Sequence, residues 1–216
     1  MNEIEKIFNL KNKVAVITGG AGYLCSQMAI TLNNIGVKII ILDKNLKQAN
    51  NIINKINKKN KENSSAYFLD VKSKESFEVC LKKIQKKYRT IDILINGAGI
   101  NAPTDFFKIS EKEWDDIMST QVKGTFFSCQ VFGKVMKKNK KGCIINISSV
   151  SSNPPLSKAF TYSVAKSGIK NLTQNLAREL AKFNVRVNAI RPGFFPTEWS
   201  KKNFIDKKNI LFRKIG

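Results

Sequence analysis

The sequence predicts an α/β fold of three layers, in which one doubly wound parallel sheet carries helices on both of its faces. The first observation behind this prediction is that short runs of branched aliphatic residues alternate regularly with longer segments that are polar on one side. The second is that the short runs are almost continuously apolar, which is typical of parallel strands buried on both faces. Strict alternation of strand and helix also favours right-handed crossovers between neighbouring strands.

Six strands and five helices are expected. The strands are predicted at residues 14–18, 37–42, 66–69, 91–95, 143–148 and 185–190. The helices are predicted at residues 24–35, 46–60, 74–88, 111–138 and 158–183. No linker, repeat or low-complexity segment separates them, and a chain of this size can bury roughly 70% of its unfolded surface without a disulfide or a metal. We therefore interpret residues 1–216 as a single domain.

Composition excludes several classes of mechanism. The chain has no histidine, which removes Ser-His-Asp and Cys-His catalysis and every histidine-ligated metal site, and no metal centre is predicted. Its four cysteines are widely spaced, without a C-x-x-C pair, as is usual in a reducing compartment. The first residues are polar, and no apolar run approaches the length of a membrane span. We therefore expect a cytoplasmic protein that does not bind membranes.

The net charge of the chain is large, but it does not by itself indicate a polyanionic partner. The formal charge is +22, yet only five of the 38 basic residues are arginine. A nucleic-acid surface is expected to use arginine for bidentate base contacts and to interleave aromatic residues. The lysine pairs stand instead in segments that are expected to be solvent-facing helices. A solvated lysine-rich surface is therefore favoured, and nucleic-acid binding is the least favoured interpretation.

A glycine-rich turn, Thr-Gly-Gly-Ala-Gly-Tyr-Leu-Cys, follows the first expected strand at residues 18–25. Glycine lets the backbone turn sharply and approach a pyrophosphate, and the next helix offers free N–H groups to the phosphates. Alone, such a turn can also be no more than a tight connection. Asp43, about 20 residues later, is placed to accept hydrogen bonds from an adenosine ribose. A carboxylate there would repel a 2′-phosphate, so NAD is favoured over NADP, although the neighbouring Lys44 weakens this preference.

Small and polar residues also follow the third and fourth expected strands. Asp70 and Val71 come after the third, and the fourth runs into Asn96-Gly97-Ala98-Gly99. Because the carboxyl ends of parallel strands meet at one edge of the sheet, where ligands bind in this type of fold, these residues are expected to complete the rim of a nucleotide site.

The second half of the chain adds Ser149, a Tyr-x-x-x-Lys pair at Tyr162 and Lys166, and Pro192-Gly193. With these motifs in this order, the chain resembles the single-domain branch of the short-chain dehydrogenase/reductase family from about residue 10 to residue 216. The resemblance implies a Rossmann-type fold and an NAD(P)-dependent oxidoreductase of the EC 1.1.1 type that interconverts a secondary alcohol and a ketone on a small molecule. It implies cofactor contacts at Gly19, Gly22, Tyr23, Leu24, Asp43, Asp70, Val71, Asn96, Ala98, Gly99, Tyr162, Lys166, Pro192, Gly193 and Thr197.

Tyr162 and Lys166 are four residues apart and therefore share one face of the expected helix. A neighbouring ammonium favours a phenolate, so Lys166 is expected to lower the pKa of Tyr162 from about 10. By the resemblance, Tyr162 moves the hydroxyl proton, Ser149 stabilises the substrate oxygen, and Lys166 also holds the nicotinamide ribose. Gln121 stands where the family usually has an asparagine that helps a water connect the lysine to solvent.

Several positions depart from the family pattern. Tyr23 and Cys25 replace the second and third glycines of the turn, and Gln121 is one methylene longer than asparagine. Residues 210–216 resemble the stretch before the family's last helix and strand, so both are expected to be missing. These departures motivate an alternative function, a catalytically weakened dinucleotide-binding protein with a sensing or interaction role.

The substrate is the least determined part of the prediction. Residues 143–149, 188–195 and 197–198 look most like sugar-acid members of the family, such as D-mannonate or gluconate oxidoreductases, whereas a generic secondary-alcohol dehydrogenase is the alternative. A homodimer or homotetramer is expected from the resemblance.

Overall fold

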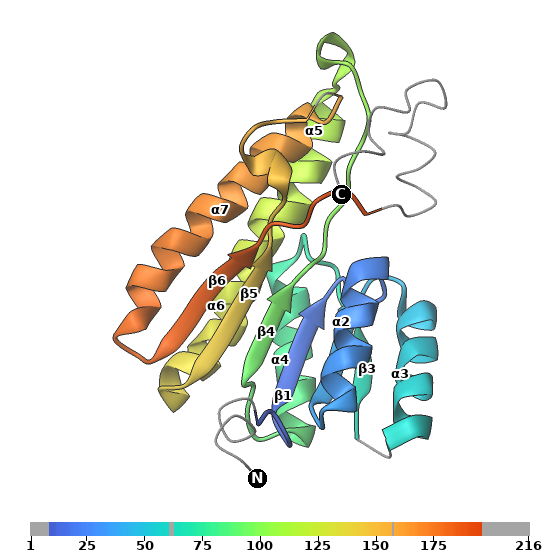
Figure 1. Cartoon of the computed structure of the whole chain (residues 1–216), viewed down its shortest axis with the longest axis vertical. Helices are drawn as coiled ribbons and strands as arrows, with labels where there is room; N and C mark the ends of the chain where they lie inside the picture. Colours follow the sequence, from blue (N-terminus) through green and yellow to red (C-terminus); the bar gives the residue numbers. More distant parts are fainter. Residues whose placement is uncertain (1–8, 61–62, 157, 196–216) are drawn as a thin grey trace.

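Six parallel strands form one sheet in the order β3-β2-β1-β4-β5-β6. The computed structural model describes residues 9–60, 63–156 and 158–195 (Figure 1). The strands are β1 (Val14–Thr18), β2 (Lys38–Asp43), β3 (Ser65–Phe68), β4 (Ile93–Asn96), β5 (Gly142–Ile147) and β6 (Val185–Ile190). The chain builds outward from β1 to β3, returns to the other side of β1, and continues to β6. This reversal creates the crevice in which doubly wound sheets bind their ligands.

Helices cover both faces of the sheet, which confirms the predicted three layers. They are α2 (Tyr23–Asn34), α3 (Leu46–Asn60), α4 (Lys74–Lys87), α5 (Glu111–Met118), α6 (Gly124–Asn139) and α7 (Phe160–Ala181). Helices α2 and α3 pack on one face, and α4, α6 and α7 pack on the other (Figure 1). In the described part of the chain, no helix is long and apolar enough to cross a membrane.

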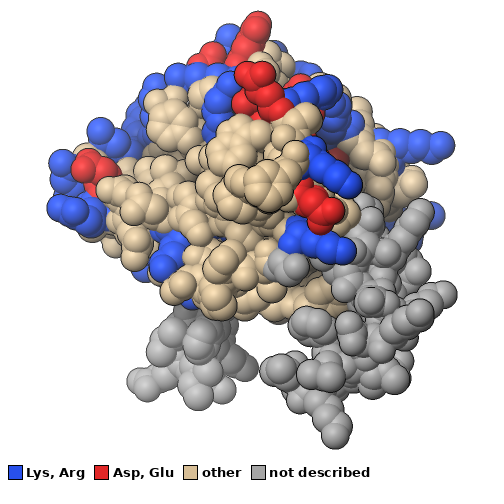
Figure 2. All heavy atoms as spheres, turned by 90° about the horizontal axis from the view of Figure 1, so that it is seen from above, with Lys and Arg blue, Asp and Glu red and all other residues tan. Residues whose placement is uncertain are grey.

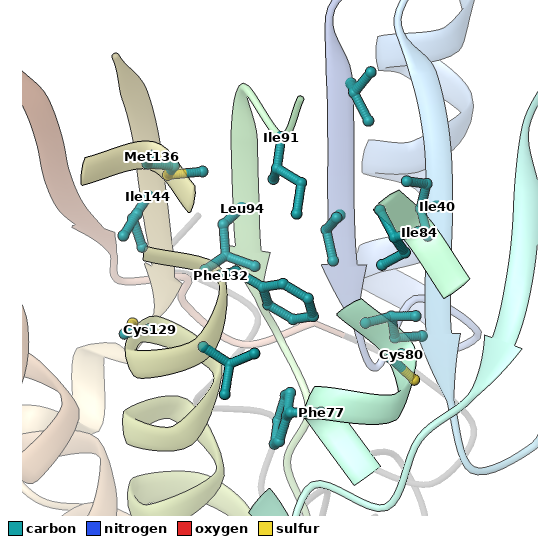
Figure 3. Packing of buried hydrophobic residues seen from close by; sticks show 14 of the residues in the cluster. Ile40, Phe77, Cys80, Ile84, Ile91, Leu94, Cys129, Phe132, Met136 and Ile144 are labelled. Carbon is teal, nitrogen blue, oxygen red and sulfur yellow. The ribbon is translucent and has the colours of Figure 1, made fainter. Parts of the chain in front are cut away.

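The alternation of side chains along β1 divides the core into two clusters. Val14 and Val16 face α4 and α6, whereas Ala15 and Ile17 face α2 and α3. In the first cluster the ring of Phe132, from α6, meets the ring of Phe77, from α4, edge to face, with centroids 5.9 Å apart and planes at 74° (Figure 3). Burial of this apolar surface holds the helices at fixed positions against the sheet.

Each expected strand and helix is present with ends shifted by no more than two residues, but two expectations need correction. The helix predicted at 111–138 is interrupted by a π-helical turn, Ser119–Lys123, which separates α5 from α6. The strand β6 is not buried on both faces, because alternate residues from Arg186 onward are exposed and Ile190 is 41% accessible. It is the edge strand of the described sheet. The expectation about a last helix and strand concerns residues 196–216, which lie outside the described residues.

Candidate active site

A cavity of about 500 Å³ opens beyond the carboxyl ends of β1, β2, β3 and β4, at the reversal of the strand order. Figure 2 looks onto this end of the molecule, where uncharged residues fill the middle of the face and mostly basic residues stand around it. Eight of the residues predicted to contact a cofactor line the cavity: Gly19, Gly22, Tyr23, Asp43, Asp70, Val71, Ala98 and Gly99. The residues predicted to bind the cofactor after each of the first four strands therefore meet at one cavity.

The glycine-rich turn has a backbone that only glycine fits at its first position. Gly19 has φ +65°, and a Cβ atom built there would lie 2.6 Å from the Cα of Ala98. Gly22 is the N-cap of α2, whose start has no side-chain cap and no acidic residue in the first turn. The first N–H groups of α2 are consequently available to an anion, and the helix dipole favours negative charge there.

Asp43 is fixed in place by backbone donors. Its Oδ2 accepts a hydrogen bond from the Ala21 amide at 3.0 Å, and its Oδ1 accepts one from the Asn45 amide at 2.8 Å. The Nε2 of Gln48 donates to the carbonyl of Ala21 at 2.9 Å and so ties α3 to the turn. The sequence analysis missed Asn45 and Gln48. An asparagine directly before a helix is a capping signal that could have identified the first.

Ser149, Tyr162 and Lys166 come together beyond β5, at the start of α7. The Oγ of Ser149 accepts hydrogen bonds from the Ser151 amide at 3.2 Å and from the Ser151 hydroxyl at 3.0 Å, and the Ser149 side chain lowers the pKa of the nearby Tyr162. The Nζ of Lys166 donates to the carbonyl of Ile147 at 2.8 Å and lies 5.3 Å from the centre of the Tyr162 ring. Because the Oγ already accepts two bonds, any further bond of Ser149, to Tyr162 or to a substrate oxygen, must use its own hydrogen.

Burial, rather than charge, controls the protonation of this group. Burial raises the pKa of Tyr162 above its usual value, and the hydrogen bond with Ser149 lowers it only in part. Burial also lowers the pKa of Lys166 from 10.5 to about 8. The expectation that Lys166 depresses the Tyr162 pKa therefore does not hold in this structure. Desolvation of the buried phenol is the largest influence on its pKa, and the only opposing influence among the described residues comes from Ser149.

The family is decided by comparison with known proteins. A family model described as short chain dehydrogenase matches residues 13–208. The chain belongs to the short-chain dehydrogenase family. An uncharacterized oxidoreductase, UxuB, of Bacillus subtilis strain 168 is 38% identical over 205 residues, which are 88% of this chain and 73% of that protein.

Two further members have more specific names. A 5-keto-D-gluconate 5-reductase of Escherichia coli K12 is 32% identical over 195 residues, covering 90% of this chain and 76% of the reductase. Among solved structures, NAD+-bound xylitol dehydrogenase superposes with a TM-score of 0.86 at 26% identity, covering 89% of this chain and 74% of that one.

Three residues that the resemblance to short-chain dehydrogenases singled out have other surroundings than the cavity. The Asn96 side chain is buried and donates to Asn146 at 2.8 Å, between β4 and β5. Leu24 packs against the core on the α2 side. Cys25 is also buried, and its Sγ lies 2.1 Å from where a Cβ on Gly97 would stand, so Gly97 makes room for the larger residue.

Gln121, at the position where short-chain dehydrogenases usually have asparagine, is fully buried in the π-helical turn. Its Nε2 donates to the carbonyl of Ile100 at 2.7 Å, while its Oε1 has no hydrogen-bond partner among the described residues. The amide thus holds the loop after β4. A role of Gln121 in proton relay stays a prediction.

The Pro192-Gly193 segment lies beside the Ser149 turn. The carbonyl of Pro192 accepts a hydrogen bond from the Val150 amide at 3.1 Å, and Gly193 is exposed, with open space around its Cα. Neither residue lines the 500 Å³ cavity. Thr197, predicted to border the nicotinamide, lies outside the described residues.

Proposed function

We propose that this member of the family is an NAD-dependent oxidoreductase that interconverts a secondary alcohol and a ketone on a polyol or a sugar acid. The observation that carries the proposal is that Ser149, Tyr162 and Lys166 meet at the carboxyl end of the sheet, where a cavity suited to a dinucleotide also opens. The first half of the chain supplies the cavity, and the second half supplies these three side chains.

The residues of the cavity fit a nicotinamide dinucleotide. The uncapped start of α2 and the close approach at Gly19 suit a pyrophosphate, because free N–H groups and a missing Cβ are what the phosphates require. Asp43 would hold the adenosine ribose, since each of its oxygens keeps a lone pair beyond the bond that it already accepts. A fixed carboxylate at this point supports NAD over NADP.

Three side chains of the chain handle the proton. A bound nicotinamide supplies the hydride donor or acceptor. The Ser149 hydroxyl, held by Ser151 from behind, donates to the substrate oxygen and fixes its place. The Tyr162 hydroxyl exchanges the proton with that oxygen. Lys166, hydrogen-bonded to the Ile147 carbonyl, keeps a cation close to the ring while its lowered pKa lets it pass a proton near neutral pH.

The substrate class rests on the relatives and on charge. The names of the related proteins specify 5-keto-D-gluconate and xylitol, which are a sugar acid and a polyol. Basic residues are numerous around this end of the molecule (Figure 2) and would attract an anionic substrate such as a sugar acid. None of the relatives described above supports a sensing or interaction role. A homodimer or homotetramer, and a location in the cytoplasm, remain predictions.

A pair of binding titrations tests the cofactor. Binding of each dinucleotide is measured by intrinsic fluorescence or calorimetry. We expect NAD to bind the wild-type chain at least tenfold more tightly than NADP. Asp43→Asn, which keeps the side-chain size but removes the charge, is expected to reduce this ratio. Tighter binding of NADP to the wild type would contradict the NAD assignment, and binding of neither would contradict the function.

A further inference from the structure

Arg191, the residue after β6, contacts the turn that carries Ser149. Its guanidinium donates to three carbonyl oxygens of that turn: Nε to Ser149 at 3.2 Å, and Nη2 to Val150 at 3.3 Å and to Asn153 at 2.9 Å. The sequence motifs assign no role to Arg191, because the contact joins positions about 40 residues apart.

The contact replaces strand pairing at the point where the sheet ends. The β5–β6 ladder runs to Ile147 opposite Ile190, followed by bonds from the Ser148 amide to Ile190 at 2.8 Å and from the Val150 amide to Pro192 at 3.1 Å. Beyond this point the carbonyls of the turn have no strand to receive hydrogen bonds from. The forked guanidinium supplies the donor for the Asn153 carbonyl. It adds a second kind of donor to the Ser149 and Val150 carbonyls, which also accept bonds from amides inside the turn.

The geometry of this turn decides where the Ser149 hydroxyl points. Both donors to the Ser149 Oγ come from Ser151, inside the turn. On the opposite side, the Ser167 hydroxyl of α7 donates to the carbonyl of Ser152 at 2.9 Å. The turn is therefore held to α7 on one side and to the end of β6 on the other, where the Arg191 side chain adds to the backbone bonds of Ser148 and Val150.

We infer that Arg191 is a positioning residue, which holds the Ser149 hydroxyl in line with Tyr162 and couples the turn to Pro192-Gly193. The inference rests on the proposed function, since it assigns Ser149 to the substrate oxygen. Lysine cannot replace Arg191, because one ammonium lacks the planar fork that spans three carbonyls.

Kinetics of Arg191→Lys and Arg191→Met test the inference. We expect both to lower kcat about 10- to 100-fold, the range for a displaced catalytic group, with little change in KM for NAD. We also expect the pH at which the oxidation rate rises to move upward, because the Ser149 hydrogen bond lowers the Tyr162 pKa. The matched controls are Arg186→Lys and Arg186→Met, at an exposed arginine within β6, and are expected to leave all three quantities unchanged.

Hydrogen exchange gives a second measurement that does not need turnover. The Ser152 and Asn153 amides donate within the turn, to Ser149 and Val150, both at 3.1 Å, and we expect them to exchange faster in both Arg191 variants than in the controls. Unchanged exchange, or unchanged kcat in an active enzyme, would overturn the inference. So would a rise in substrate KM alone, which would make Arg191 a substrate-binding group. If the wild type turns over no substrate, the proposed function fails, whereas exchange still decides whether Arg191 holds the turn.

Discussion

Substituting Gly19 by alanine should disrupt the nucleotide-binding turn, because both the backbone conformation and the neighbouring atoms at this position exclude a side chain. The backbone there is left-handed, which costs an L-residue about 1–2 kcal/mol. The new methyl would also stand 2.6 Å from the Cα and 2.7 Å from the amide nitrogen of Ala98, both backbone atoms that cannot rotate away. Overpacking of this kind costs about 1–3 kcal/mol. The expected loss in the free energy of unfolding is therefore about 2–5 kcal/mol.

Urea denaturation measures this loss, and with a slope of about 2 kcal/mol per molar the midpoint should fall by about 1–2.5 M. NAD affinity should fall with it, because the turn must move to admit the methyl. Gly133→Ala is the matched control. Gly133 lies inside α6, and a Cβ atom there would meet only Ile144, at 4.0 Å. The same change should therefore raise the free energy of unfolding by up to about 1 kcal/mol. A Gly19→Ala chain with wild-type stability and NAD affinity would refute the argument from the turn.

Three further predictions follow from burial and charge. The pKa of Lys166 is about 8 in the folded chain and 10.5 in the unfolded chain, so the unfolded wild type holds more protons between pH 8 and pH 10. The free energy of unfolding of the wild type should therefore rise with pH in this range relative to that of Lys166→Met. Parallel urea-derived stabilities across this range would contradict it. Phe132→Ala should cost about 3–5 kcal/mol of unfolding free energy, since the ring is fully buried against α4; a loss below 1 kcal/mol would show that the core closes around the gap. Gln48→Ala should weaken NAD binding several-fold while leaving the helix content by circular dichroism unchanged, because its amide fixes the carbonyl of Ala21; wild-type affinity would count against that tie.

The features that the sequence predicted well are local in the chain. The glycine turn, the carboxylate of Asp43 and the Tyr162–Lys166 pair follow from strand ends and from helical spacing, which involve only nearby residues. The doubly wound parallel sheet also followed, because alternation of strand and helix restricts the topology.

The features that it missed depend on contacts between distant segments. The clamp of Arg191 on the Ser149 turn and the tie of Gln48 to the glycine turn are both of this kind. The direction in which the Tyr162 pKa shifts also depends on burial, and the spacing of residues along the chain does not reveal burial. The position of Asn96 at a strand end suggested that it lines the cavity. Its side chain instead bonds to Asn146 on the neighbouring strand β5 and lies within the sheet.

The central claim is that Tyr162 exchanges the substrate proton at a site that also binds NAD. Its most direct test is the absorbance of NADH during incubation of the chain with NAD and a panel of polyols and sugar acids, for the wild type and for Tyr162→Phe. We expect turnover by the wild type on at least one substrate, and a loss of about 10²- to 10⁴-fold in the variant with nearly unchanged NAD affinity. Turnover retained by Tyr162→Phe would show that another group exchanges the proton.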